Sequence, residues 1–321
     1  MRLDIPRGRA AVTAHAPTVA SYLLTAILLA LALSFAPYLL SGGNLNTQLT
    51  FAAFIGLAAL GQTLVVLAGG IDLSVPWVVA FGAIQLGNFG DLPGGAAIVL
   101  IVVLGGLIGM ANGLGVVALG VSPIIMTIAV GGLVQGYLLE FGRGNLYSAV
   151  PELANTIVTS SIGPVPLIVV VWGILACATG AVLSKTIVGR RIYAVGTNDR
   201  TARLSGINVP GTRVLTYVIS GAMAAFTGVL LAGFLGAAYP TIGEPYLFGS
   251  IAAVLLGGAA IEGGRGSYWG TIAGTLTITL LGALTPVLGL NQGELRMVYG
   301  LVILIGLYMA RGGLLLASNR R

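Results

Sequence analysis

The feature that most constrains this chain is a series of apolar stretches, each about twenty residues long and separated by glycine, proline or charge. A helix of that length spans the hydrocarbon core of a bilayer. The chain of 321 residues is 57% hydrophobic and only 7% charged, which excludes an ordinary soluble domain. Membrane β-barrels instead show short segments of alternating hydrophobicity. We therefore expect an all-α integral membrane protein.

The stretches predict about ten transmembrane helices. The third and the eighth, at about 74–88 and 247–261, are short and are bounded by glycine-rich segments. Eight spans plus two re-entrant pieces are therefore the alternative. The predicted centres lie near residues 28, 59, 81, 106, 131, 174, 225, 252, 278 and 303.

The distribution of Lys and Arg sets the expected orientation. With ten spans and the N-terminus inside, all fifteen of these residues except Arg143 and Arg296 face the cytoplasm, where basic residues concentrate. We expect a cytoplasmic N-terminal tail at residues 1–16, one transmembrane domain at 17–313, and a cytoplasmic C-terminal tail at 314–321. The first apolar run is too long for a signal peptide, so it is expected to remain as a span.

Residues 185–213 form the one long basic stretch inside the chain and carry six of its fifteen Lys and Arg residues. Such a run must lie in water, and its sign favours the cytoplasm. We expect another subunit to dock there. The alternative is a solvated loop whose charges only set the topology.

A short helix is expected within this loop. Thr197 or Asn198 can cap a helix over residues 199–204, and Gly206 suits a left-handed position beyond its end. Two basic side chains would lie on one side of this helix, Arg200 and Arg203.

Glycines at four-residue spacing recur in two places, five predicted spans apart. An odd offset gives equivalent segments opposite orientations, so the pattern suggests two inverted five-helix halves. Close helix packing, or chance in a chain with 50 glycines, explains the same spacing. The two sets are Gly105, Gly109 and Gly113, and Gly266, Gly270 and Gly274.

Candidate residues for a translocation path are few and mostly neutral. Asp72 and Ser74 lie in the string GGIDLSV at 69–75, where they either cap the third span or line a broken-helix gate. Uncharged amides suit a neutral, hydroxyl-rich solute, and they suit hydrogen bonds between helices equally well. The amides expected on the path are Gln85, Asn112 and Gln135.

The chain offers little for catalysis or for a metal site. Its one histidine, His15, and its one cysteine, Cys177, cannot build a metal cluster or a disulfide framework. The glycine-rich string at 257–270 lacks the Gly-Lys-Ser/Thr ending of a phosphate loop, so we expect no nucleotide there. Topology explains the basic residues, so no nucleic-acid partner is expected.

Three strings together resemble the ribose-type family of ABC importer permeases, within the branched-chain amino acid and sugar permease superfamily. They are GGIDLSV at 69–75, GRRIYAVGTNDRTARLSGI at 189–207, and a block from Tyr239 to Gly274 that contains IAAVLLGG and GGRGSYWGTIAG. Their order and spacing agree with that family over nearly the whole chain. The resemblance implies a type II-like permease in the bacterial inner membrane.

The resemblance also implies partners: a second permease, a cytoplasmic ATPase that holds ATP and Mg, and a periplasmic binding protein that delivers a monosaccharide. The resemblance further implies that this chain is surrounded by membrane lipid, that it binds no cofactor, and that it is not an enzyme. A nucleoside, an amino acid or a furanose-like signal is the alternative solute. A stand-alone secondary transporter is the other functional class, and it would take up solute without ATP.

Carried over to this sequence, the middle string forms the surface that an ATPase would move. Two departures from the family pattern stand out: Pro76-Trp77 replaces the usual Gly-Ser, and Phe248-Gly249 stands where an acidic residue is expected. These departures leave the identity of the sugar unassigned and allow a heterodimer as well as a homodimer. The residues implied in coupling, with the two arginines of the short helix, are Arg190, Arg191, Tyr193, Asn198, Arg200, Ala202, Arg203 and Gly206.

Overall fold

The structure is a computed structural model that describes residues 7–89, 92–141 and 152–304. This part of the chain is almost entirely helical, which confirms the predicted all-α membrane class. Seven of its helices are long and apolar enough to cross a bilayer. They are α1 (Arg7–Phe35), α2 (Gly42–Leu67), α4 (Gly94–Ala118), α5 (Pro123–Phe141), α7 (Leu167–Lys185), α10 (Val209–Leu235) and α12 (Tyr268–Val287).

Two shorter apolar helices, α3 (Val75–Asn88) and α11 (Glu244–Leu256), occupy the third and eighth predicted positions. Both have proline in the first turn, where the missing N–H costs no helical hydrogen bond. Each of the ten predicted centres falls within a helix. The remaining elements are η1 (Pro37–Leu40), α6 (Glu152–Thr159), the strands β1 (Ser161–Ile162) and β2 (Val165–Pro166), α8 (Ile187–Thr197), α9 (Asp199–Leu204) and a helix at 292–304.

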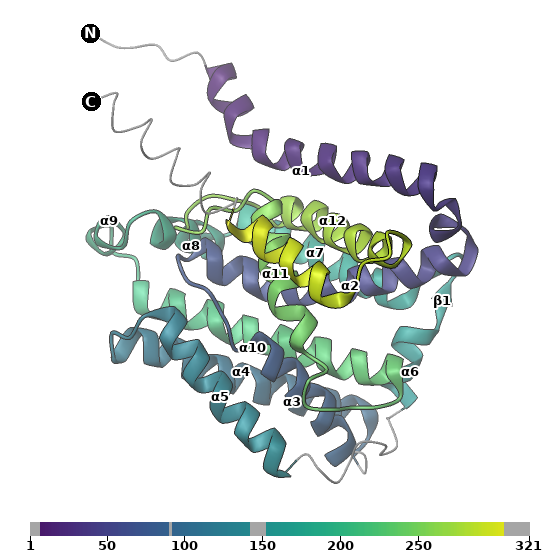
Figure 1. The fold of residues 1–321 in the computed structure, drawn as a ribbon. Coiled ribbons are helices and arrows are strands. Elements are labelled where there is room, and N and C mark those ends of the chain that lie inside the picture. The colour runs from purple at the N-terminus through teal and green to yellow at the C-terminus, as the bar shows by residue number, and fades with distance from the viewer. Residues whose placement is uncertain (1–6, 90–91, 142–151, 305–321) are drawn as a thin grey trace.

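The long helices lie side by side, with α8 and α9 at one end of the bundle and the β1–β2 hairpin at the other (Figure 1). Helix α10 packs against α2, α3 and α4, and helix α2 also packs against α11 and α12. The largest hydrophobic core extends beyond these helices and includes Phe54 of α2, Phe81 of α3 and Trp172 of α7.

Helix α1 lies at the edge of the bundle and packs mainly on α12 (Figure 1). Hydroxyl groups join the two helices: Thr25 Oγ1 lies 2.9 Å from Thr277 Oγ1, and the Tyr22 hydroxyl donates to the Trp269 carbonyl. The apolar part of α1 begins at Pro17, and the helix itself begins at Arg7, within the predicted tail. The predicted C-terminal tail at 314–321 lies outside the described residues.

Glycines of both sets mark close contacts between helices. A Cβ on Gly109 would overlap the carbonyl oxygen of Tyr217 in α10, and a Cβ on Gly274 would overlap that of Ala253 in α11. Small residues at such positions let helix backbones approach closely in lipid. The four-residue spacing therefore has a packing function in both places, whatever its origin.

Candidate functional site

The three strings that carry the resemblance meet at one end of the bundle. Gly69, Gly196 and Gly263 come from three distant parts of the chain and lie backbone to backbone. A Cβ on Gly263 would lie 2.8 Å from the Gly69 Cα and 3.0 Å from the Gly196 Cα, both too close for a side chain. Gly69 and Gly263 also have positive φ angles of 81° and 90°, which favour glycine. The strings therefore form one packed unit.

Hydrogen bonds hold this unit together. The Gly264 N–H donates to the carbonyl of Leu67, the last residue of α2, at 2.9 Å. The Tyr193 hydroxyl in α8 donates to the Gly266 carbonyl at 2.8 Å. Burial raises the pKa of Tyr193 above its ordinary value of 10.0, so the donor stays protonated at physiological pH. Helix α8 is thus tied to the loop that precedes α12.

The expected short helix is present as α9, at the predicted bounds. Asn198 is its N-cap, since its side chain accepts from the Thr201 N–H at 2.9 Å, and Gly206 has a φ of 77°. An ion pair of 2.7 Å between Asp199 and Arg213 joins α9 to the first turns of α10. The preceding helix, α8, was not predicted, although its N-cap at Thr186 is of the same kind.

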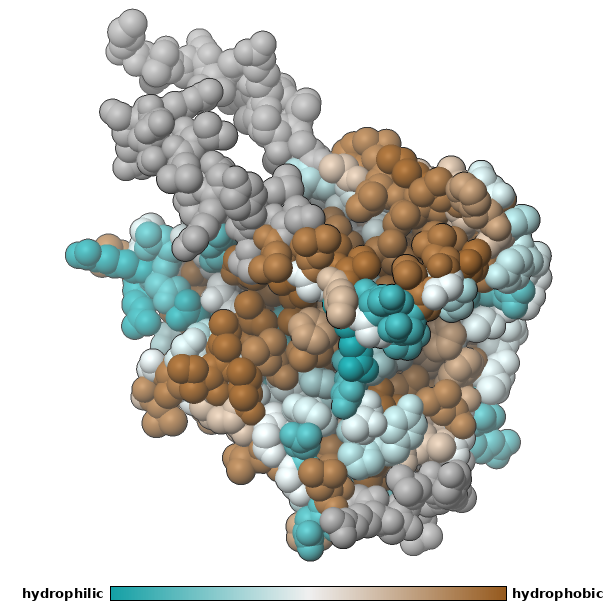
Figure 2. Space-filling model, in the orientation of Figure 1, coloured by the Kyte–Doolittle hydropathy of each residue, from teal (hydrophilic) through white to brown (hydrophobic). Residues whose placement is uncertain are grey.

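Helices α8 and α9 present a surface that we call the basic face. Ala202 is buried against Val195 and Val209, and this contact seats α9 on the bundle. The hydrophilic surface at this end of the molecule is visible in Figure 2. The side chains expected in coupling that are exposed here are Arg190, Arg191, Asn198, Arg200 and Arg203.

A cavity of about 420 Å³ lies beside α9 on the basic face. Two arginines line it, Arg203 and Arg213, and only the second is paired with a carboxylate. Gly69 and the turn between α4 and α5 complete its wall. The face therefore has an excess of positive charge, which suits a partner with acidic side chains.

Three of the residues predicted for the path come together in what we call the Asp72 cluster. Asp72 Oδ1 accepts from the Ser74 N–H at 3.0 Å and from Ser74 Oγ at 2.6 Å. Its Oδ2 accepts from Ser220 Oγ in α10 at 2.7 Å, and Asn112 Nδ2 in α4 donates to Ser74 Oγ at 2.8 Å. All four residues are buried. The cluster joins the α2–α3 junction to α4 and α10.

The other two predicted path residues lie elsewhere. Gln85 is about three turns further along α3, where its Oε1 accepts from Asn88 Nδ2 at 2.6 Å. Gln135 is half-buried on α5. Gln85 and Gln135 lie inside predicted spans and Asp72 lies just before one, so all were candidates for the path, but the fold distributes them over different parts of the bundle.

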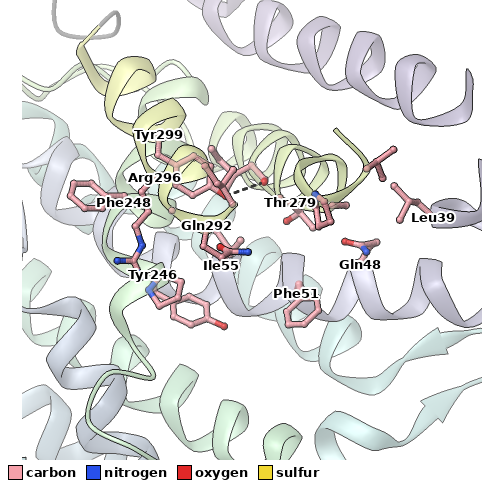
Figure 3. A pocket seen from close by; sticks show the side chains of 18 of the residues that line it. Leu39, Gln48, Phe51, Ile55, Tyr246, Phe248, Thr279, Gln292, Arg296 and Tyr299 are labelled. Carbon is pink, nitrogen blue, oxygen red and sulfur yellow. Dashed lines mark hydrogen bonds between the residues drawn. The ribbon is translucent and has the colours of Figure 1, made fainter. Parts of the chain in front are cut away.

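A second cavity, of about 470 Å³, lies between α2, α11, α12 and the helix at 292–304 (Figure 3). We call it the aromatic cavity, because Phe51, Tyr246 and Phe248 line it. An ion pair of 3.3 Å between Glu244 and Arg296 also borders it. It lies toward the start of α2, whereas the basic face lies at the end of α2.

None of the residues predicted for the path lines the aromatic cavity. Two signals in the sequence could have indicated it. Arg296 is one of the two basic residues placed outside by the charge count, and Phe248 is part of a departure from the family pattern. Among the described residues, no group of three or more His, Cys, Asp or Glu side chains could hold a metal ion.

A model of the family described as "Branched-chain amino acid transport system / permease component" matches residues 44–307, which is most of the chain. The chain belongs to this permease family. The permease is 34% identical to the ribose import permease protein RbsC of Bacillus subtilis (strain 168), over 86% of its own length and 87% of that protein. No solved structure matches it.

Other similar proteins agree. The ribose import permease protein RbsC of Escherichia coli (strain K12) is 32% identical, covering 87% of this permease and 89% of that protein. The fructose import permease protein FrcC of Rhizobium meliloti is 30% identical, covering 79% and 73%. The basic face, the Asp72 cluster and most of the lining of the aromatic cavity lie within the family match of this multi-pass membrane permease.

Proposed function

We propose that this permease is the membrane subunit of an ATP-driven ABC importer that carries a monosaccharide. The observation that carries the proposal is its alignment, over most of both chains, with permeases that import ribose and fructose. The permease itself forms part of the path and is not an enzyme. ATP and Mg are bound by a separate ATPase subunit.

The proposed topology has ten spans, two inverted halves and both termini in the cytoplasm of a bacterium, in its inner membrane. Helix α10 packs on α3 and α4, and α2 packs on α11 and α12, which is the pairing that exchanging two halves would produce. The residues that begin the two short helices also meet, since a Cβ on Gly243 would overlap the carbonyl of Pro76. The exposed arginines favour a cytoplasmic basic face.

The ATPase docks on the basic face, through the exposed arginines of α8 and α9. Closure of the ATPases on ATP moves these helices and switches the path between outward-facing and inward-facing states. Two links support this role. The Asp199–Arg213 ion pair joins α9 to α10, and the Tyr193 hydrogen bond joins α8 to the loop before α12.

Two permease chains, identical or different, enclose the path, and a solute-binding protein docks at the end opposite the basic face. Asp72, Ser74 and Asn112 serve the path by holding the α2–α3 junction, because they are buried and bonded to one another. Gln85 and Gln135 are proposed to border it.

Purification of the native complex in mild detergent tests the proposal. We expect an ATPase subunit and a binding protein to copurify, and a second permease in equal amount would establish a heterodimer. In liposomes, the complex should take up D-ribose or D-fructose only with ATP and loaded binding protein. Uptake by the isolated chain without ATP would instead establish a secondary transporter. A nucleoside or an amino acid bound to the purified complex would contradict a monosaccharide as the solute.

A further inference from the structure

We infer that the aromatic cavity is a binding site for a neutral, hydroxyl-rich solute of monosaccharide size, held within a single permease chain. The inference rests on the proposed function and adds the place where the solute is held. The cavity is about 470 Å³, within the range of small-ligand sites, and is lined by five segments of the chain: η1, α2, α11, α12 and the helix at 292–304.

The cavity offers hydrogen-bonding groups that the protein leaves free. Within the described residues, the side chains of Gln48 and Gln292 and the hydroxyl of Tyr246 have no protein hydrogen-bond partner. The two amides provide donors and acceptors, and the phenol provides one of each. Figure 3 shows these three side chains around the same space, from α2, the 292–304 helix and α11. A sugar hydroxyl, which both donates and accepts, matches all three.

The charges in the cavity cancel one another. Glu244 and Arg296 form an ion pair at its edge, and in this pair only one guanidinium nitrogen, Nη2, contacts the carboxylate. The other donors of Arg296 remain available to hydroxyl oxygens. An amino acid would need separate charged partners for its ammonium and carboxylate groups, and a paired Glu–Arg does not supply them. A neutral solute is therefore favoured.

Aromatic rings supply the rest of the lining. Phe51, Tyr246 and Phe248 present apolar surfaces, and Phe51 is held at its place by edge-on contact with the ring of Phe234 at 5.7 Å between centroids. A sugar ring has an apolar face of C–H groups and a rim of hydroxyls. The cavity combines apolar walls with a few polar groups, which is the usual construction of a specific small-molecule site.

Thiol labelling of the purified complex tests the site directly. Thr279 lines the cavity, so Thr279→Cys in a Cys177→Ser background places one reactive thiol there. We expect D-ribose or D-fructose at millimolar concentration to slow its labelling by a small thiol reagent. Adding Gln48→Leu or Tyr246→Phe should raise the half-protecting concentration about three- to ten-fold, as expected for one lost hydrogen bond. Tyr137→Phe on α5, outside this cavity, should leave it unchanged.

The outcomes separate this site from the proposed function. Protection is measured without ATP and first on the chain in which Thr279→Cys is the one change to the lining, so it does not depend on whether the Gln48 and Tyr246 variants fold. If neither sugar protects Thr279→Cys while the complex still imports sugar with ATP, the site is wrong and the function stands. Equal protection in Gln48→Leu, Tyr246→Phe and Tyr137→Phe also overturns the site. If the complex imports no sugar, the proposed function fails.

Discussion

The hydroxyl of Tyr193 donates a 2.8 Å hydrogen bond to the carbonyl of Gly266, which lies 73 residues later in the chain. The bond joins the amphipathic helix α8 to the glycine-rich loop before α12. Both partners belong to strings that stood out in the sequence, yet their contact exists only in the fold. If an ATPase moves α8 and α9, this bond passes the displacement to α12.

Tyr193→Phe should therefore weaken coupling without unfolding the permease. Losing the bond should lower the free energy of unfolding by about 0.5–1.5 kcal/mol. We expect less sugar transported per ATP hydrolysed in liposomes, with normal assembly. Because burial raises the pKa of this phenol, the bond is present below about pH 10 and is lost only as the pH rises through the folded-state pKa. The wild type and the variant should differ by the same amount of sugar transported per ATP at pH 6 and at pH 8. A difference that changes over this range would contradict the role of the hydrogen bond.

Gly196→Ala should disrupt the junction of the three strings. The new Cβ would overlap the carbonyl oxygen of Leu67 and the amide nitrogen of Gly264, both of them backbone atoms. Overpacking of this kind costs about 1–3 kcal/mol. Thermal unfolding in detergent should show the loss. Gly132→Ala on α5 is the matched control, because nothing lies within 4 Å of its added Cβ.

Arg200→Glu combined with Arg203→Glu should abolish copurification of the ATPase. Both side chains are exposed on α9, so the reversal changes the charge of the basic face and should change the thermal stability little. The lysine double variant should retain binding, since it keeps the charge. Intact assembly and transport in the glutamate variant would remove the coupling role from this face.

Ser220→Ala should destabilise the permease by about 1–3 kcal/mol, because it leaves the buried Asp72 Oδ2 without its hydroxyl donor. Thermal unfolding of the purified chain measures the effect. Ser34→Ala is the control, since that hydroxyl is exposed on α1 and bonds only within its own helix. Equal melting temperatures for the two variants would mean that the Asp72 cluster does not hold the helices together.

Glu244→Gln and Arg296→Gln should each change stability by less than about 1 kcal/mol, because both side chains are well exposed, at 37% and 51%. A loss of sugar uptake in either variant would then result from the change in the cavity and not from unfolding. The exchange Glu244→Arg with Arg296→Glu keeps the cavity neutral, so it should transport better than either single charge reversal. Uptake that is no better in the exchange would argue against a role for neutrality.

Helix α9 was predictable because capping is local. Asn198 bonds to an N–H three residues away, and Gly206 adopts a left-handed conformation that few other residues tolerate. The apolar spans were predictable for a similar reason, since bilayer thickness sets their length. The helix at 187–197 was missed, although the Thr186 cap and the spacing of its apolar residues were available.

The path residues could not be assigned in this way. A polar residue in an apolar span either faces a solute or forms a hydrogen bond to another helix. The residue type is the same in both cases, so the sequence does not distinguish them. In the fold, the side chains of Asp72 and Asn112 both form hydrogen bonds with the Ser74 hydroxyl. The aromatic cavity needs Gln48, Tyr246 and Arg296 from three segments, and no spacing in the sequence connects them.

By itself, the sequence determined the membrane class, the short capped helix and the family resemblance, because each depends on composition or on residues close along the chain. Only the tertiary structure decided which distant residues meet. The contact of Gly69, Gly196 and Gly263 and the lining of the aromatic cavity follow from how helices pack. That packing depends on the fit of whole surfaces, which no single stretch of sequence contains.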